Sequence, residues 1–135
     1  MLRLTGPVHA QMIGHCLDGV PLEACGLLGG DPATGKATLC YPARNDAASA
    51  RLYTVNPQDH LRAGRDAEAR GLDLIGVFHS HTHTDAYPSP TDVAQAPDPA
   101  WHYVIVSLRD MAPVIRSFRI QDGNIAEEPV VLEGG

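Results

Sequence analysis

Apolar residues recur along this chain with two different periods, and each period predicts a different kind of element. Spacings of three and four residues, typical of an amphipathic helix, run from about Pro7 to Asp18. A second, more charged helix is expected from Asn56, which precedes a proline, to about Arg70, which precedes a glycine. Shorter apolar or β-branched runs predict strands, and they cover residues 2–4, 24–30, 37–41, 52–55, 72–78, 101–107, 113–120 and 125–132.

Turn-forming residues separate these elements and indicate how some of them connect. The segment Asp31-Pro32-Ala33-Thr34-Gly35 joins two strand-like runs and predicts a hairpin. A short helix is expected to begin at Ser89-Pro90, and Pro97 and Pro99 interrupt the chain after it. The sequence contains no internal repeat and no low-complexity linker. A chain of 135 residues with this pattern predicts a single α/β domain that spans residues 1–135.

Composition and charge exclude several classes of function. The net charge of −6 argues against a nucleic-acid partner, which requires clustered lysine and arginine. No apolar run approaches the roughly 20 residues that cross a bilayer, and the first residues lack the long apolar core of a signal peptide. Three cysteines without a Cys-x-x-Cys pair suit a reducing compartment. A cytoplasmic protein without a membrane partner is therefore expected.

Candidate chemistry is concentrated at His79-Ser80-His81, directly after the apolar run 72–78. Side chains alternate between the two faces of a strand, so His79 and His81 should point the same way as the strand leaves the sheet, with Ser80 opposite. The polar residues after them predict a loop that folds back, and Asp92 then returns to the histidines in the first turn of a helix. Two imidazoles and one carboxylate suit a zinc ion with an open position for water.

The segment Ser89-Pro90-Thr91-Asp92 also has a purely structural interpretation. Ser89 suits the N-cap of a helix, Pro90 its first position, and Asp92 the position that completes a capping box. Such caps are common, but a capped helix start is also a rigid place for a ligand carboxylate. The histidine pair and the acid together favour a metal site over a cap alone.

Glu23 is a lone carboxylate among apolar residues and glycines, in Pro21-Leu22-Glu23-Ala24-Cys25-Gly26. Its flanks favour the edge of a strand that lines a site, and it is a candidate proton carrier for water on the metal. The alternative is a surface residue between a helix and a strand. Cys25 would share its side of such a strand, either as a small buried residue or, less favoured, as an extra ligand. His83 and Asp85 in the following loop need no role as surface residues, and the alternative is that they bind a second or different metal.

Glu23, His79-x-His81 and, after seven intervening residues, Ser89-x-x-Asp92 together resemble the full signature of the JAMM (MPN-plus) metalloprotease family. The resemblance implies a mixed central sheet flanked by two or three helices. It also implies one zinc ion per chain with the ligands His79, His81 and Asp92. Glu23 would then bond the catalytic water, and Ser89 would help to stabilise the oxyanion.

The resemblance implies a substrate class as well, and it leaves alternatives open. Small bacterial members of the family release cysteine or another amine from the C-terminal glycine of sulfur-carrier proteins, and we expect this activity. The expected partner is a ubiquitin-like or sulfur-carrier protein that ends in Gly-Gly. A general isopeptidase on lysine-linked ubiquitin-like conjugates is one alternative. A non-catalytic interaction module with a structural zinc is another, although such sites usually have four protein ligands. A deaminase is disfavoured because its His-x-Glu and Pro-Cys-x-x-Cys pattern is absent.

The chain ends in Gly134-Gly135, which resembles the tail that such an enzyme binds. Flexible glycines at a chain end are common, so an ordinary terminus is favoured over a self-occluding tail. The pattern carries no prediction of the oligomeric state.

Overall fold

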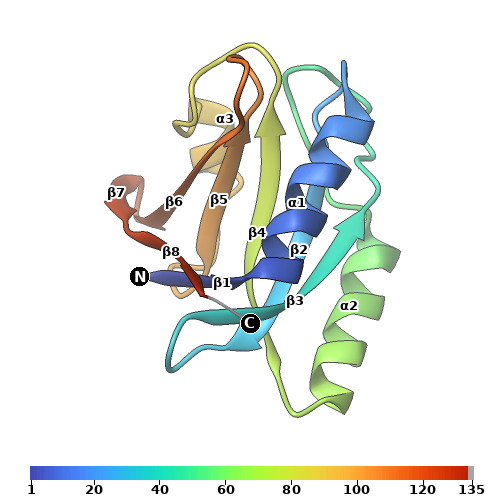
Figure 1. The fold of residues 1–135 in the computed structure, drawn as a ribbon, viewed down its shortest axis with the longest axis vertical. Coiled ribbons are helices and arrows are strands. Elements are labelled where there is room, and N and C mark those ends of the chain that lie inside the picture. Colours follow the sequence, from blue (N-terminus) through green and yellow to red (C-terminus); the bar gives the residue numbers. More distant parts are fainter. Residues whose placement is uncertain (134–135) are drawn as a thin grey trace.

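The computed structural model describes residues 1–133, which form one eight-stranded mixed sheet and three helices (Figure 1). The strands are β1 (Leu2–Thr5), β2 (Cys25–Asp31), β3 (Lys36–Ala43), β4 (Asp73–His81), β5 (His102–Ser107), β6 (Val114–Gln121), β7 (Asn124–Glu128) and β8 (Val130–Glu133). The helices are α1 (Gly6–Gly19), α2 (Pro57–Ala69) and α3 (Pro90–Ala94). The strand order is β7-β6-β5-β4-β2-β3-β1-β8. A mixed sheet flanked by helices confirms the predicted fold class.

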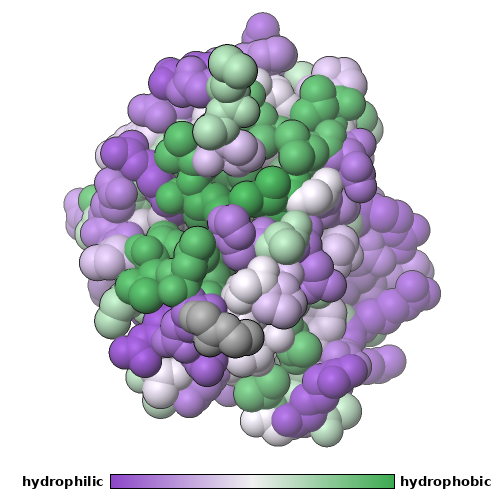
Figure 2. All heavy atoms as spheres, viewed as in Figure 1, coloured by the Kyte–Doolittle hydropathy of each residue, from purple (hydrophilic) through white to green (hydrophobic). Residues whose placement is uncertain are grey.

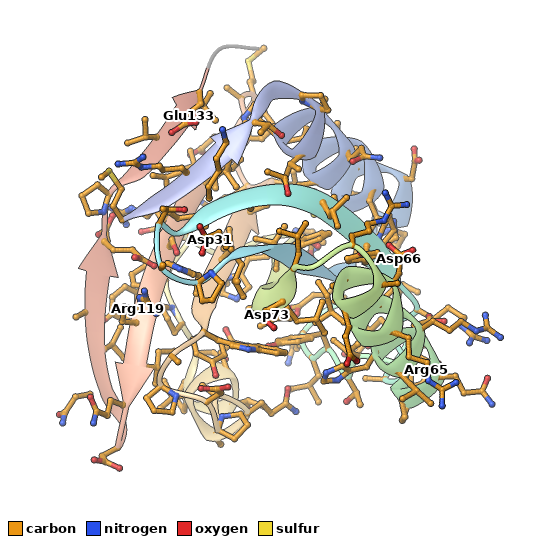
Figure 3. The ribbon with its side chains drawn as sticks, turned by 90° about the horizontal axis from the view of Figure 1, so that it is seen from below. Asp31, Arg65, Asp66, Asp73, Arg119 and Glu133 are labelled. Carbon is orange, nitrogen blue, oxygen red and sulfur yellow. The ribbon has the colours of Figure 1, made fainter. Side chains whose placement is uncertain are left out.

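The two faces of the sheet carry separate apolar clusters, because alternate residues of the central strands point to opposite sides. In β4, Phe78 belongs to one cluster and Val77 to the other. Helix α1 contributes to the Phe78 cluster through Val8, Met12 and Cys16, and α2 contributes Ala63 to the Val77 cluster. When the molecule is seen from below, α1 and α2 lie on opposite faces of the sheet (Figure 3).

Strand β4 lies near the centre of the sheet and is paired along both edges. It runs antiparallel to β2 and parallel to β5, so that Val77 lies opposite Leu27 on one side and Tyr103 on the other. All its residues from Ile75 to His81 are buried. The strand extends three residues beyond the predicted run, which ended at residue 78. Both histidines of the motif therefore lie within the sheet, whereas the sequence predicted them where the strand leaves it.

The predicted strand over residues 125–132 is divided in the structure at Pro129. The part before it, β7, pairs with β6, and the part after it, β8, pairs with β1. Proline has no N–H to donate to a ladder, and the chain changes here from one end of the strand order to the other. Because Pro129 alone joins the two end strands, the sheet curls until its two edges approach each other (Figure 3).

The predicted strand over residues 52–55 is wrong, since this segment makes only an isolated bridge with Asn45. The side-chain amide of Asn45 takes the place of a neighbouring strand. Its Oδ1 accepts a hydrogen bond from Thr54 N at 2.8 Å, and its Nδ2 donates to Leu52 O at 3.0 Å. The apolar pattern here marks inward-facing residues of a loop, since Tyr53 is buried and Val55 packs against the same apolar cluster.

The surface of the molecule is unevenly apolar. Hydrophilic residues cover α2, whereas hydrophobic residues gather on the face that carries α1 and β8 (Figure 2). The exposed apolar side chains of these two elements include Leu17, Val131 and Leu132. Within residues 1–133, the helices are too short or too polar to cross a bilayer.

Gly76 lies opposite His102 where β4 and β5 pair. A Cβ at position 76 would come within 2.5 Å of the His102 carbonyl oxygen, a backbone atom that cannot turn aside. We expect Gly76→Ala to lower the free energy of unfolding by about 1–3 kcal/mol, as overpacking does in protein cores.

Gly14→Ala in α1 is the matched control. No atom lies within 4 Å of a Cβ placed there, and helix propensity predicts a gain of about 0.5–1 kcal/mol. Denaturant titration of the two variants measures both effects, and equal stabilities would contradict the close approach of β4 and β5.

Candidate metal centre

His79 and His81 extend from the same face of β4, as strand alternation predicted. Their Nε2 atoms lie 3.2 Å apart, and both side chains are buried. The ring of Tyr53 stacks on the ring of His79, with the two centroids 4.1 Å apart. Strand pairing thus fixes the backbone of both histidines, and the Tyr53 ring restricts the orientation of one imidazole.

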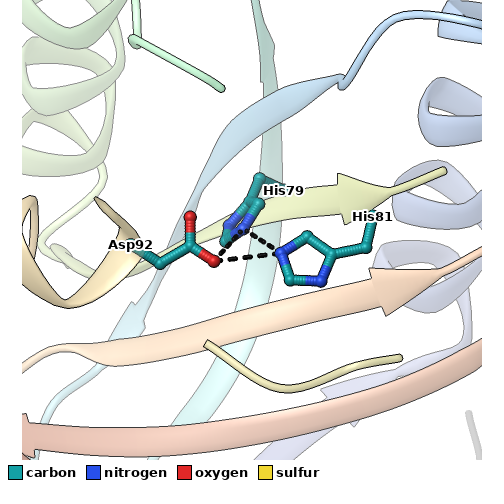
Figure 4. A group of neighbouring side chains, drawn as sticks. All are labelled: His79, His81 and Asp92. Atoms are coloured by element: carbon teal, nitrogen blue, oxygen red, sulfur yellow. Dashed lines mark hydrogen bonds and ion pairs between the residues drawn. The ribbon is translucent and has the colours of Figure 1, made fainter. Parts of the chain in front are cut away.

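Asp92 reaches the histidines from the first turn of α3 (Figure 4). Its Oδ2 lies 3.2 Å from His79 Nε2 and 2.9 Å from His81 Nε2. The predicted capping box is also present: the Ser89 hydroxyl accepts from Asp92 N at 3.1 Å, and Ser89 N donates to Asp92 Oδ2 at 2.9 Å. The two interpretations of this segment are therefore compatible, because the cap fixes the carboxylate where the histidines converge.

A hydrogen bond to the backbone defines which ring nitrogen of His81 carries a proton. Its Nδ1 lies 2.7 Å from the carbonyl oxygen of Asp85, which can only accept, so Nδ1 must donate. A neutral His81 then presents a bare Nε2 to the Asp92 carboxylate, which also only accepts. Two acceptors 2.9 Å apart repel each other unless a cation lies with them. A proton on the His81 ring or a bound metal ion can supply this positive charge.

The electrostatics of the three side chains agree with this arrangement. Burial lowers the pKa of His79, and the Asp92 carboxylate offsets only part of the effect. Burial also opposes a charge on His81, but hydrogen bonds with Asp92 and with the Asp85 carbonyl outweigh it and raise the pKa of His81. Burial of Asp92 is likewise outweighed, since contacts with both histidines hold its pKa well below the usual range. An ionised carboxylate therefore faces one neutral imidazole and one that readily takes a positive charge.

The three converging atoms fit a small divalent metal ion. Among residues 1–133, His79, His81 and Asp92 form a buried group whose ligand atoms all lie within 4.8 Å of one another. Their separations of 2.9–3.2 Å approach the edge of about 3.3 Å in a tetrahedron whose metal–ligand bonds measure about 2.0–2.1 Å, as they do for zinc. Three protein ligands are the number that leaves a fourth position for water or substrate.

Glu23 lies two residues before β2 and not on a strand, and hydrogen bonds to distant segments fix its backbone. Its neighbour Ala24 is bonded to β4: Ala24 N donates to the Ser80 hydroxyl, and Ser80 N donates to Ala24 O, both at 2.9 Å. Glu23 N donates to Ser49 O at 2.8 Å, and Glu23 O accepts from the Asn45 side-chain amide at 2.9 Å. The Glu23 loop is therefore bonded to both β4 and the segment that follows β3.

Glu23 is 5% exposed, and its side-chain oxygen Oε1 has no hydrogen-bond partner. Buried polar atoms are normally bonded, so this oxygen indicates a missing ligand or water. Burial is the main cause that raises the pKa of Glu23 to about 7, with further opposed effects of His81 and Asp92. Glu23 can therefore take up and release a proton near neutral pH.

A pocket of about 420 Å³ joins the predicted site residues. Glu23, His81 and Ser89 share its wall with Arg51 and Thr82. The Ser89 hydroxyl accepts from a backbone N–H of α3, which leaves its own hydrogen available to a molecule in the pocket. The structure therefore places the unpaired carboxylate, one imidazole of the ligand group and a hydroxyl donor around one cavity.

The other residues that the sequence suggested as ligands lie outside the three-residue group. His83 lines the same pocket but is exposed, and the Asp85 carboxylate forms ion pairs with surface arginines. Cys25 is buried, and its thiol donates to a backbone carbonyl at 3.7 Å. Burial raises the pKa of Cys25 to about 12, which disfavours the thiolate that a metal binds. Gly134-Gly135, the suggested self-occluding tail, lies outside the described residues.

Four residues that shape the site were not identified from the sequence. Tyr53 stacks on a histidine, Ser80 and Asn45 bond the Glu23 loop, and Arg51 lines the pocket. Only Ser80 had a usable signal, because a polar side chain on the buried face opposite the histidines must find a partner. The other three act through contacts between segments that are far apart in the chain.

This fold and site define a mixed-sheet domain with three side chains that could hold a metal ion beside an unpaired carboxylate. Residues 5–121 match the family described as prokaryotic homologs of the JAB domain. The chain belongs to this family, which confirms the JAMM-type resemblance of its motif.

Relatives match the chain over most of its length. The CysO-cysteine peptidase of Mycobacterium tuberculosis is 39% identical over 120 residues, which cover 88% of this chain and 82% of the relative. A desampylase of Haloferax volcanii is 32% identical over 111 residues, which cover 78% of this chain and 80% of the relative. The solution structure of a protein from Desulfitobacterium hafniense has a TM-score of 0.91 and 35% identity, and covers 100% of this chain and 94% of that one.

Substitutions should distinguish the proposed metal ligands from Glu23, which is not expected to bind the metal. We expect one zinc ion per chain, and we expect His81→Ala and Asp92→Ala to lose it, because each removes one of three ligand atoms. Glu23→Gln should keep it. The exposed His83 in the same pocket provides a matched control, so His83→Ala should also keep it. Elemental mass spectrometry after dialysis measures occupancy, and zinc retained by His81→Ala would contradict the assignment.

The buried Glu23 should also make stability depend on pH. Burial raises the pKa of its carboxyl from 4.5 to about 7, so the folded state binds more protons than the unfolded state between these values. The free energy of unfolding of the metal-free protein should therefore fall as pH rises through this window. In Glu23→Gln this part of the pH-dependent decrease in the free energy of unfolding, on the order of 2–3 kcal/mol, should be absent.

Urea titrations of the wild type and Glu23→Gln at pH 5 and pH 8, both with a chelator, measure this effect. Other groups titrate in both proteins, so only the difference between the two proteins is attributed to Glu23. If that difference is the same at both pH values, Glu23 does not titrate as the structure indicates.

Proposed function

We propose that this protein is a zinc-dependent peptidase that hydrolyses the amide bond after the C-terminal glycine of a ubiquitin-like or sulfur-carrier protein, releasing cysteine or another amine. The proposal is carried by one observation: three ligand atoms meet beside Glu23, whose buried oxygen has no partner. His81 and Glu23 also line the same pocket, which gives a substrate access to both.

The chain supplies a ligand set and two further groups for hydrolysis. His79 and His81 would hold zinc through Nε2, and Asp92 through Oδ2. A zinc ion there would supply Lewis acidity, and with it a water molecule that loses a proton near neutral pH. Glu23 takes the proton from the attacking water and later returns it to the nitrogen of the leaving amine. The Ser89 hydroxyl donates to the carbonyl oxygen as that oxygen gains negative charge.

Glu23 suits this proton transfer because its backbone is fixed by hydrogen bonds while its carboxylate oxygen Oε1 has no partner within the protein. Hydrogen bonds to Ser49 and Asn45 fix the main chain, whereas Oε1 bonds nothing else. Because its pKa is raised to about 7, both protonation states of the carboxyl are populated near neutral pH. A glutamate on the surface would lack both the buried oxygen without a partner and the raised pKa.

A structural zinc in a non-catalytic module is the alternative from another class. Structural sites are usually closed by four protein ligands, whereas the group found among residues 1–133 has three. One of the three, His81, lines an open pocket. Both observations favour hydrolysis.

The relatives support the class of substrate. The relative named CysO-cysteine peptidase favours the release of cysteine from a small carrier protein. The relative named desampylase supports, as a second candidate, an isopeptidase on lysine-linked conjugates of ubiquitin-like proteins. We place the reaction in the cytoplasm, which suits the three free cysteines.

Incubation of the zinc-loaded protein with carrier–cysteine adducts and with lysine-linked conjugates, followed by mass spectrometry of the products, tests the proposal. We expect cysteine release from the adduct. Glu23→Gln should slow turnover by about 10²–10⁴-fold while keeping its zinc, and Ser89→Ala should slow it by about 10²–10³-fold. Glu68→Gln alters an exposed glutamate of α2 and should leave the rate unchanged.

Each result has a separate meaning. A normal rate in Glu23→Gln would show that Glu23 is not the proton carrier. Cleavage of lysine-linked conjugates alone would favour the second candidate, and cleavage of neither substrate would exclude the proposed reaction.

A further inference from the structure

The pocket that contains Glu23 and His81 also carries a cation in its wall, and the proposed mechanism does not use this cation. Arg51 lines the cavity together with Glu23, Thr82 and Ser89. We propose that Arg51 binds the α-carboxylate of the amino acid that leaves, so that the enzyme selects a C-terminal amino acid over a lysine side chain. This inference rests on the proposed function and extends it to the leaving group.

Hydrogen bonds place Arg51 beside the proton carrier. The two residues before it are bonded to the pocket walls: Ser49 O accepts from Glu23 N at 2.8 Å, and Ala50 O accepts from the Thr82 hydroxyl at 3.4 Å. Arg51 N in turn donates to the Ser49 hydroxyl at 3.0 Å. The Arg51 backbone is therefore bonded through its neighbours to both the Glu23 segment and the end of β4.

The Arg51 guanidinium is not committed to a carboxylate of the protein. Among residues 1–133 no ion pair involves Arg51, although other surface arginines have acidic partners, such as Arg44 with Asp59 and Arg116 with Glu127. The chain carries a net charge of −6, so an arginine without an acidic partner in a pocket is not explained by a shortage of carboxylates. A planar guanidinium suits a carboxylate because it can donate two parallel hydrogen bonds.

The chemistry of the two proposed leaving groups differs at this point. A free amino acid joined through its amine to the carrier's glycine has a carboxylate on the carbon next to the scissile nitrogen. When Glu23 protonates that nitrogen, the carboxylate lies within the same pocket as Arg51. A lysine joined through its ε-amine presents a methylene stem there, and its own carbonyl is part of a peptide bond without charge. Arg51 therefore distinguishes the two by charge.

Two forms of one substrate isolate this contact: a carrier adduct ending in Gly-Gly-Cys with a free carboxylate, and the same adduct with a C-terminal carboxamide. We expect the zinc-loaded wild type to cleave the acid with a kcat/KM about tenfold higher than that for the amide, the size of one charge-assisted hydrogen-bonded contact. Arg51→Gln should reduce the value for the acid to that for the amide, and Arg51→Lys should retain part of the preference.

Two controls separate this effect from loss of structure. Arg65→Gln removes the same charge from an exposed position on α2, where the side chain points away from the sheet (Figure 3), and should keep the full preference. Zinc content should be the same in all variants. Equal cleavage of acid and amide by the wild type, or an unchanged preference in Arg51→Gln, would overturn the inference.

Binding provides a measurement that does not depend on turnover. In a Glu23→Gln background, fluorescence anisotropy should show about tenfold tighter binding of the acid than of the amide, and the added Arg51→Gln change should remove the difference. Tighter binding of the acid without any cleavage by the wild type would support Arg51 and reject the proposed reaction. Cleavage without any difference in binding or rate would support the reaction and reject the role of Arg51.

Discussion

The parallel pairing of β4 with β5, which continues to His81 and Ser107, is the constraint on which the site depends. Side chains change face at each residue of a strand, so a register shift of one residue would turn both histidines toward α1 and Ser80 toward the pocket. Strands β2 and β5 fix the register from both sides, and the two hydrogen bonds between Ser80 and Ala24 extend it beyond the end of β2. The sheet therefore sets the position of the two candidate ligand histidines, and the capping box of α3 sets that of Asp92.

The site gathers charges that folding by itself does not favour. The Nε2 of His81 faces the Asp92 carboxylate, which requires a proton or a metal ion between them, and Glu23 has a buried oxygen without a partner. Buried polar groups of this kind are costly unless they are paired. The capping box of Ser89 satisfies part of Asp92, but the arrangement is complete only with a cation between the acceptors.

The loop between β3 and α2 connects the separate functions that we assign to the pocket. Tyr53 from this loop stacks on a metal-site histidine, and Ser49 and Asn45 bond the backbone of Glu23. Arg51 lies between these contacts and faces the cavity. One segment thus orients an imidazole, fixes the proton carrier and presents the cation proposed for the leaving group. Changes of this loop should alter substrate choice while the sheet and the metal ligands remain the same.

The sequence by itself determined the local parts of this protein. The histidine pair on a strand and the box between Ser89 and Asp92 join residues two or three positions apart, where strand alternation and helix capping fix the geometry. The full motif also indicated the family and the mixed sheet. Only the tertiary structure decided the rest. The amide of Asn45 replaced a strand partner, so residues 52–55 form a loop, and Pro129 divided one apparent strand between the two ends of the sheet.

Contacts between distant segments also explain why the positions of Glu23, Tyr53 and Arg51 could not be predicted from the sequence. The sequence did identify Glu23 as a candidate proton carrier, but not where it lies. Each is positioned by hydrogen bonds or stacking between segments that are distant in the chain. Local periods arise from the repeat of a helix or a strand, and contacts across the fold leave no such period in the sequence.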